Sequence, residues 1–174
     1  LSSVLTNLGD AVLDIQWLAS ATLPLPGHSH TVRHYAGQHV HEFIEQDEVL
    51  TRSVWKRENR RGRTSHDCFP GAVVLTPGAS DDTGVVYGGH LAWSGNHQQF
   101  IEWLHDGQYQ WQMGEWLAPG ECLLPPGQSW DTPQWIASCS SAGCNGLAAN
   151  FHAELRRRLP WDQGRMRPRP VHLN

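Results

Sequence analysis

Hydrophobic and polar residues alternate along most of the chain with a period of two. In an extended strand successive side chains point to opposite faces, so this alternation predicts half-buried β-strands. The clearest stretches are Leu13, Ile15 and Trp17, then His39, His41 and Phe43, and finally Ile101 and Trp103 on either side of Glu102.

Turn-forming residues separate these stretches at short intervals. Asp106-Gly107, between IEWLH and QYQWQM, predicts a tight hairpin in which both central residues adopt positive φ. Many short strands with regular turns and no interleaved helices predict an all-β fold, an antiparallel sandwich. Further turns are expected at residues 8–10, 24–27, 77–78, 96, 119–120 and 125–127.

One segment after Cys144 departs from the strand pattern. Its apolar residues fall four apart, which predicts one face of an amphipathic helix. Residues 156–158 are arginines, which the dipole of a helix favours in the last turn, and Pro160 ends the helix. The apolar face consists of Leu147, Phe151, Leu155 and Leu159.

Composition excludes several classes of protein. The chain has 174 residues and a formal net charge of -4, so it carries no general electrostatic attraction for nucleic acid or membrane. No apolar run approaches the ~20 residues that a membrane-spanning helix needs. Its four cysteines form no Cys-x-x-Cys pair, so reduced thiols and a cytoplasmic location are expected, with a Cys139–Cys144 disulfide as the alternative.

Both ends of the sequence predict a piece of a larger protein. Leu1 is not an initiator methionine, and VLTNLGDAVLDIQW enters directly into a strand, turn, strand pattern. At the other end RPRPVHLN has the pattern of a strand that stops in its middle. The chemistry of the whole protein is therefore expected outside this piece.

Five segments in one order carry a resemblance to a known family. The order resembles the N-terminal β-supersandwich of bacterial α-galactosidases that hydrolyse raffinose and melibiose, retaining enzymes related to plant raffinose synthases. Cys68 and Phe69 depart from the polar pair that is usual in the first segment. The segments are residues 60–70, which begin with RRGRTSH and end at Pro70, GVVYGGHLAWSGN at 84–96, LAPGE at 117–121, Thr132-Pro133, and Gly143 to Gly146.

The resemblance implies a galactose-mutarotase-like sandwich that carries no catalytic residue. Retaining glycosidases use two carboxyl groups ~5 to 5.5 Å apart, and in this family both are aspartates of a (β/α)8 barrel beyond Asn174. Residues 1–142 would be the sandwich, itself truncated at its start, 143–160 a linker helix, and 161–174 the start of the barrel. No cofactor is implied. The implied partners are the barrel, an α-galactoside substrate and further copies of the whole protein.

The resemblance also suggests residues that contact substrate or the barrel. His39 takes the position where family members often place a tryptophan that reaches a neighbouring subunit's pocket. Arg60, Arg61 and His66 are expected to pack against the barrel, with Arg61 paired to a barrel carboxylate, and Asn174 to lie near the pocket edge. A loop staple within the sandwich and a phosphate site are the alternatives for the arginines.

Tryptophans and acidic residues favour structural roles. Trp17, Trp93 and Trp103 are expected in the core, although tryptophan rings also stack on sugars. Carboxylates of the Asp81-Asp82 pair, Glu102 and Glu121 are expected to be solvated or to cap turns. Three further tryptophans flank turns and are expected to cover a sheet edge or a domain interface, namely Trp116, Trp130 and Trp135.

Two alternative functions remain open. Gly37, His39, His41 and Glu45 mimic the first metal motif of cupins, but no segment supplies the second, so no metal is expected. His28, His30 and His34 are expected in loops or on strand surfaces. A free-standing carbohydrate-binding sandwich would share the tryptophans but would not need the helix and tail after Gly143.

Overall fold

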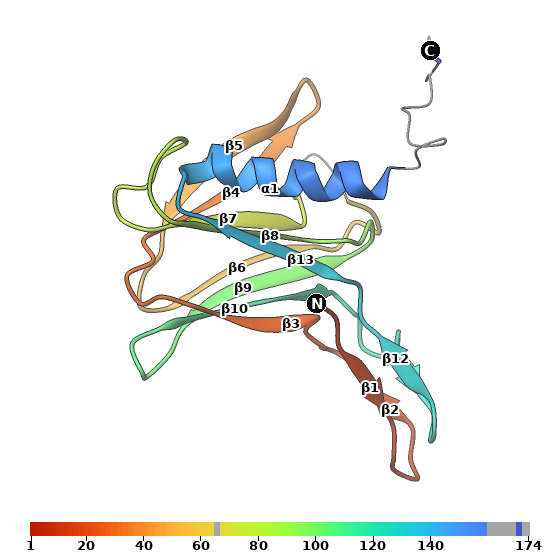
Figure 1. Ribbon diagram of the computed structural model, residues 1–174. Helices are drawn as coiled ribbons and strands as arrows, with labels where there is room; N and C mark the ends of the chain where they lie inside the picture. Colours follow the sequence, from red (N-terminus) through yellow and green to blue (C-terminus); the bar gives the residue numbers. More distant parts are fainter. Residues whose placement is uncertain (65–66, 160–169, 172–174) are drawn as a thin grey trace.

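Two antiparallel β-sheets face one another, and one helix lies on the outer side of the larger sheet (Figure 1). The computed structural model describes residues 1–64, 67–159 and 170–171. The smaller sheet has the strand order β3-β10-β9-β6 and the larger has β13-β8-β7-β4-β5. Every ladder between described strands is antiparallel, which confirms the predicted sandwich. The bounds are β3 Ala21–Leu25, β4 Thr31–Gln38, β5 His41–Val49, β6 Val54–Asn59, β7 Gly71–Leu75, β8 Val86–Leu91, β9 His97–Trp103, β10 Tyr109–Glu115 and β13 Trp135–Ser140.

Two short ribbons extend from one end of the sandwich. They pair β1 (Val4–Thr6) with β12 (Ser129–Asp131) and β2 (Leu13–Asp14) with β11 (Leu123–Leu124). The strand predicted over residues 13–17 is therefore only two residues long. Leu13 is exposed while Ile15 is buried just beyond the strand, so the two do not share a buried face as predicted, because pairing stops after Asp14. Ile15, Leu117, Cys122 and Leu124 form a small core of their own.

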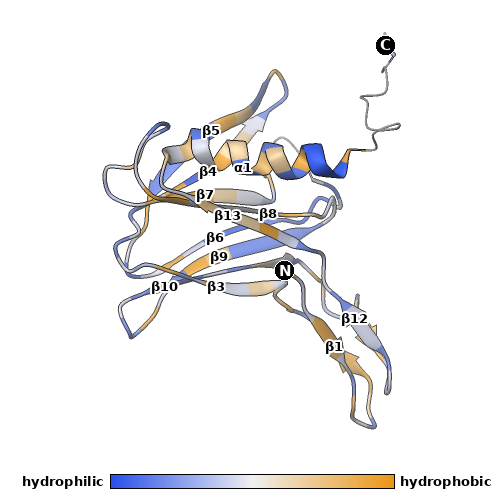
Figure 2. Cartoon of the chain, viewed as in Figure 1, coloured by the Kyte–Doolittle hydropathy of each residue, from blue (hydrophilic) through white to orange (hydrophobic). Residues whose placement is uncertain are grey.

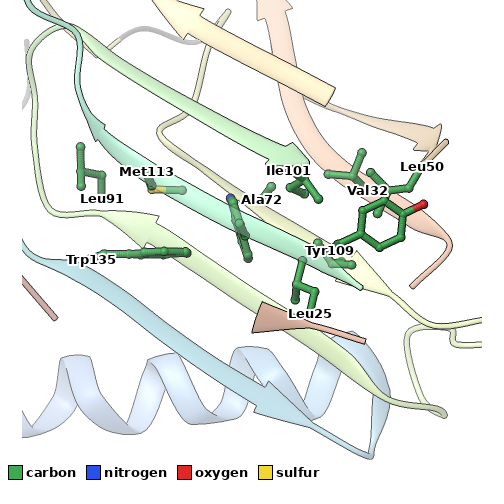
Figure 3. Close-up of a cluster of buried hydrophobic side chains, with 11 residues drawn as sticks. Leu25, Val32, Leu50, Ala72, Leu91, Ile101, Tyr109, Met113 and Trp135 are labelled. Carbon is green, nitrogen blue, oxygen red and sulfur yellow. The ribbon is translucent and has the colours of Figure 1, made fainter. Parts of the chain in front are cut away.

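The main core fills the space between the two sheets (Figure 3). Trp111 and Trp135 meet edge to face there, with ring centroids 5.0 Å apart. Trp135 was expected at a sheet edge or interface but is 0% exposed, because the first residue of β13 points inward opposite Leu91. Trp93, expected in the core, is 42% exposed in the loop before β9. The core consists of Leu25, Val32, Leu50, Ala72, Val74, Leu91, Ile101, Tyr109, Trp111, Met113 and Trp135.

The hairpin between β9 and β10 confirms the turn predicted at Asp106-Gly107 but not the predicted backbone conformation of both residues. Three residues, 105–107, lie between Leu104 and Gln108, whose N–H and O are hydrogen-bonded (2.8 Å), and Gly107 N–H donates to Leu104 O (3.1 Å). Only Gly107 has positive φ, at 81°, so the expectation of positive φ at Asp106 is wrong. A turn followed by one left-handed glycine is the usual three-residue solution, because only one residue then needs that conformation.

Helix α1 (Gly143–Arg158) confirms the predicted helix. Its buried residue Leu147 packs against Leu75 and Val86 on the outer face of the larger sheet. The fit depends on Gly88, since a Cβ there would lie 2.4 Å from Leu147 Cδ2. Leu155, on the same helical face, is 59% exposed. The arginine-rich last turn is the most hydrophilic part of the helix in Figure 2, as predicted, and Pro160 lies outside the described residues.

Candidate interdomain site

Asn59 and Asn96 hold the arginine-rich loop that follows β6. Asn59, the last residue of β6, is only 3% exposed. Its Nδ2 donates to the carbonyl of Arg63 (2.7 Å), and its Oδ1 accepts from the N–H of Arg61 (2.9 Å). Gly62 has φ 75° at the top of the turn and donates its N–H to Asn96 Oδ1 (2.6 Å). The side-chain amides of Asn59 and Asn96 therefore fix the loop backbone by hydrogen bonds.

Arg60 and Arg61 of this loop have separate partners. Arg60 pairs with Glu58 (2.5 Å), and its guanidinium lies 4.5 Å from the ring centre of Trp116. Arg61 pairs with Asp67 in the same loop, yet its side chain is 69% exposed. Because the guanidinium groups are paired with different carboxylates, they do not converge on one anion as a phosphate site requires. A contact of Arg61 beyond this chain stays a prediction.

A polar network centred on the buried His34 joins the two sheets next to this loop. His34 on β4 shares a 2.5 Å hydrogen bond with Glu48 on β5, and its Nδ1 contacts the guanidinium of Arg57 on β6. Arg57 also donates to the carbonyl of Asp67 (3.1 Å). His34 is buried, so the expectation of a loop or strand-surface residue is wrong for it, while His28 and His30 are exposed as expected.

The charges in this network are set by burial and by its partners. Burial and the positive charge of Arg57 lower the pKa of His34, although Glu48 opposes them. Desolvation alone would raise the pKa of Glu48, but hydrogen bonds from Trp55 and His34 outweigh it and leave that pKa below its ordinary value. At neutral pH the network therefore holds a neutral imidazole between a carboxylate and a guanidinium.

The buried polar residues His97 and Glu115 were not identified from the sequence. His97 donates from Nδ1 to Gly95 O (3.2 Å) and meets the thiol of Cys68 at Nε2 (3.7 Å). Glu115 is a buried carboxyl group whose pKa is raised by desolvation. The signal for Glu115 was present, because it continues the inward-facing alternation of Tyr109, Trp111 and Met113 along β10.

Asp81, Asp82 and Glu121 are exposed, as predicted, whereas Glu102 is half-buried on β9. Glu121 Oε2 accepts the N–H of Ala118 (2.7 Å) and so caps its turn. Asp82 accepts from the side chain of Asn145 at the start of α1 (2.9 Å). Glu102 accepts from Gln110 Nε2 on the neighbouring strand (3.0 Å).

His39 lies at the tip of the β4–β5 hairpin, where its side chain is 93% exposed and 3.8 Å from Glu42. Val40 beside it has φ 75°, so the chain turns between His39 and His41. The predicted continuous strand over 39–43 is therefore wrong, and the two histidines do not form the strand motif of a cupin. Within the described ranges no group of three or more His, Cys, Asp or Glu residues is arranged to hold a metal ion.

The structure brings only some of the predicted site residues together. Arg60 and Arg61 share one loop, whereas no hydrogen bond or ion pair joins either of them to His39 among the described residues. His66 and Asn174 lie outside the described residues. Trp116, half-buried under Arg60, was expected at an edge or interface and lies next to the arginine loop.

In the described part of the chain, no helix is long and apolar enough to cross a membrane.

Solved structures of carbohydrate-active enzymes contain a similar sandwich. The crystal structure of the α-galactosidase AgaA from Geobacillus stearothermophilus superposes with a TM-score of 0.86 at 30% identity, over 98% of this chain and 24% of that one. The crystal structure of an AgaA variant in complex with 1-deoxygalactonojirimycin superposes with a TM-score of 0.83 at 29% identity, over 91% of this chain and 22% of that one.

The family follows from the sequence match. Residues 1–124 match the glycosyl hydrolase family 36 N-terminal domain, and the chain belongs to that family. It is 39% identical to the α-galactosidase of Escherichia coli over 174 residues, which cover 98% of this chain and 24% of that protein. It is 33% identical to AgaA over 132 residues, 76% of this chain and 18% of AgaA. The chain therefore spans about a quarter or less of the length of these curated relatives.

Proposed function

We propose that this chain is the non-catalytic N-terminal part of an α-galactosidase that releases terminal α-D-galactosyl residues from melibiose or raffinose. The observation that carries the proposal is the match over 98% of this chain to 24% of an Escherichia coli protein named α-galactosidase. The catalytic groups belong to polypeptide outside the matched region, and the sandwich supports them.

The side chains of the described residues favour a supporting role. Retaining hydrolysis needs two carboxyl groups facing one cavity. Glu115 is buried next to the small core, and the cavity beneath α1 has Glu154 on its wall, which pairs with Arg158 (2.7 Å). The remaining carboxylates discussed above cap turns or pair with strand neighbours. These positions suit structural roles better than acid/base catalysis.

The proposal includes a division of the chain. Residues 1–142 are the sandwich, 143–160 the linker helix and 161–174 the start of the catalytic barrel. The packing of α1 against the larger sheet supports the boundary between residues 142 and 143, since the helix lies outside the sandwich core. The barrel is the main partner, and Asn174 lies towards the edge of its pocket.

The proposal also assigns contacts to the exposed site residues. Arg60, Arg61 and His66 contact the barrel, and His39 at its hairpin tip contacts a neighbouring copy in a homo-oligomer. A cytoplasmic location is proposed as well, and the four free cysteines support it because reduced thiols are typical of that compartment.

Hydrolysis of an aryl α-galactoside tests the function. The full-length protein that contains this chain should release the aryl group, while the chain alone should release nothing above buffer. An aryl β-galactoside is the control substrate and should remain intact. Turnover that follows the isolated chain through purification, or an inactive but folded full-length protein, would contradict the proposal. Calorimetric binding of melibiose by the chain alone would favour a carbohydrate-binding module instead.

A further inference from the structure

A groove of about 380 Å³ runs between α1 and the outer face of the larger sheet. We call it the helix-side groove. Its walls come from β4, β7, β8, β13 and α1, together with the loop before β7, and its size falls in the range of specific binding pockets. Lining residues include Tyr35, Phe69, His90, Leu147, Ala148 and Phe151.

Rings form a nearly continuous wall along this groove. Phe43 meets Phe69 at a centroid distance of 6.2 Å, and Tyr35 meets Phe69 at the same distance. Phe69 then lies 6.4 Å from His90, which lies 5.6 Å from Phe151 on α1. The wall therefore extends from the β4–β5 hairpin to the second half of the helix.

The groove suits an apolar occupant better than a sugar. Burial lowers the pKa of His90 and raises the pKa of Tyr35, so both rings are neutral at neutral pH. Glu154 and Arg158 at the rim are engaged with each other. A sugar carries many hydroxyl groups, and each one left without a partner would lose a hydrogen bond to water. An aliphatic or aromatic side chain has no such requirement.

Apolar surface continues beyond the groove. Leu155 on α1 and Leu159 just after it are exposed, as are Phe43 and Ile44 on β5. The outer face of the smaller sheet is more mixed, because Gln110 and Glu102 lie there beside Phe100, whose ring packs against Trp17. Contiguous apolar surface marks an interaction site, so the helix side is the face that a partner covers.

We propose that the helix-side groove receives an apolar side-chain ridge from the polypeptide that longer family members possess outside the matched region. The chain covers only 24% of its Escherichia coli relative, so a partner of the required size exists in such proteins. Arg158, the last residue of α1, lines the groove, so the polypeptide that follows the helix starts beside it. The inference rests on the proposed function, because it takes this chain to be part of such a protein.

Cys144 provides a native probe of the groove. It lines the groove and is partly exposed, whereas Cys139 on β13 is exposed and does not line it. Alkylation with iodoacetamide at alkaline pH, read by peptide mass spectrometry, should modify Cys144 at least tenfold more slowly in the full-length protein than in the chain alone. The rate ratio of Cys144 to Cys139 should fall accordingly. An unchanged ratio overturns the proposal.

Neighbouring alanines provide a matched pair of variants. Ala148 lines the groove, while Ala149 is exposed. Ala148→Phe should fill the groove and lower the melting temperature of the full-length protein, and Ala149→Phe should not lower it. Both variants of the chain alone should keep a cooperative melt. Equal behaviour of the two in the full-length protein overturns the proposal.

The outcomes also separate this inference from the proposed function. A full-length protein that hydrolyses the aryl α-galactoside but leaves Cys144 reactive refutes the groove proposal alone. Protection of Cys144 without hydrolysis refutes the proposed activity alone. Protection of Cys144 in the chain alone at high concentration, with a dimer mass by light scattering, assigns the groove to a second copy. An apolar small molecule retained in native mass spectrometry assigns it to a ligand, and either result overturns the proposal.

Discussion

Acidification should destabilise this sandwich through His34, which bridges its two sheets. The imidazole is buried between Glu48 on β5 and Arg57 on β6. A guanidinium can only donate, so His34 Nδ1 accepts and the proton lies on Nε2, which donates to Glu48 over 2.5 Å. A second proton on the ring would point an N–H at the Arg57 guanidinium and break the link between the sheets.

The sign of the pH effect follows from the direction of the pKa shift. Burial and Arg57 lower the pKa of folded His34, whereas an unfolded histidine titrates near ~6.5. Below about pH 6.5 the unfolded chain therefore binds more protons than the folded chain, so the free energy of unfolding falls as the pH falls. One proton of difference corresponds to about 1.4 kcal/mol per pH unit. Burial lowers the pKa of His90 and His97 as well, so both add in the same direction.

Urea unfolding of the chain between about pH 8 and pH 5 measures this slope. His34→Gln keeps a donor towards Glu48 but cannot titrate, so its slope should be smaller than that of the unaltered chain by up to about 1.4 kcal/mol per pH unit. His28→Gln is the matched control, because His28 is exposed, and it should keep the original slope. An unchanged slope in His34→Gln would refute the assignment to this residue.

Two further predictions concern α1 and the arginine loop. Leu147→Ala should lower the free energy of unfolding by about 2–5 kcal/mol, because Leu147 is buried against the sheet, whereas Leu155→Ala should change it by less than about 0.5 kcal/mol. Equal losses in chemical denaturation would show that the helix is not seated as described. Arg61→Ala should leave the melting temperature of the chain unchanged, since its pair with Asp67 is exposed, but lower kcat/KM of the full-length protein about tenfold. Activity lost only in proportion to folded protein would assign Arg61 to a loop staple.

The sequence predicted the fold because its local signals agree with one another. Alternation along β9, the Asp106-Gly107 turn and the apolar face that contains Leu147 each define an element by short-range spacing. Errors arose where burial depends on distant residues. Alternation does not say which face of a strand points inward, so His34 and Trp135 were expected at the surface and Trp93 in the core. Amphipathic rings suit both environments, and only the pairing of strands decides between them.

The sequence predicted the arginines of the candidate site but not the two asparagines that order their loop. RRGRTSH identified the arginine loop, whereas Asn59 and Asn96 act through contacts that sequence spacing does not reveal, the second of them 34 residues away from Gly62. These contacts bear directly on the interdomain prediction. Ordering a long side chain and its loop at an interface costs conformational entropy. The amides of buried Asn59 and half-buried Asn96 already order the backbone, while the Arg61 side chain stays 69% exposed and able to reach a partner. Because the loop backbone is already ordered, a contact made by the exposed Arg61 guanidinium costs less conformational entropy than a contact made by a flexible loop. This favours a positioning role for Arg61 in the longer protein.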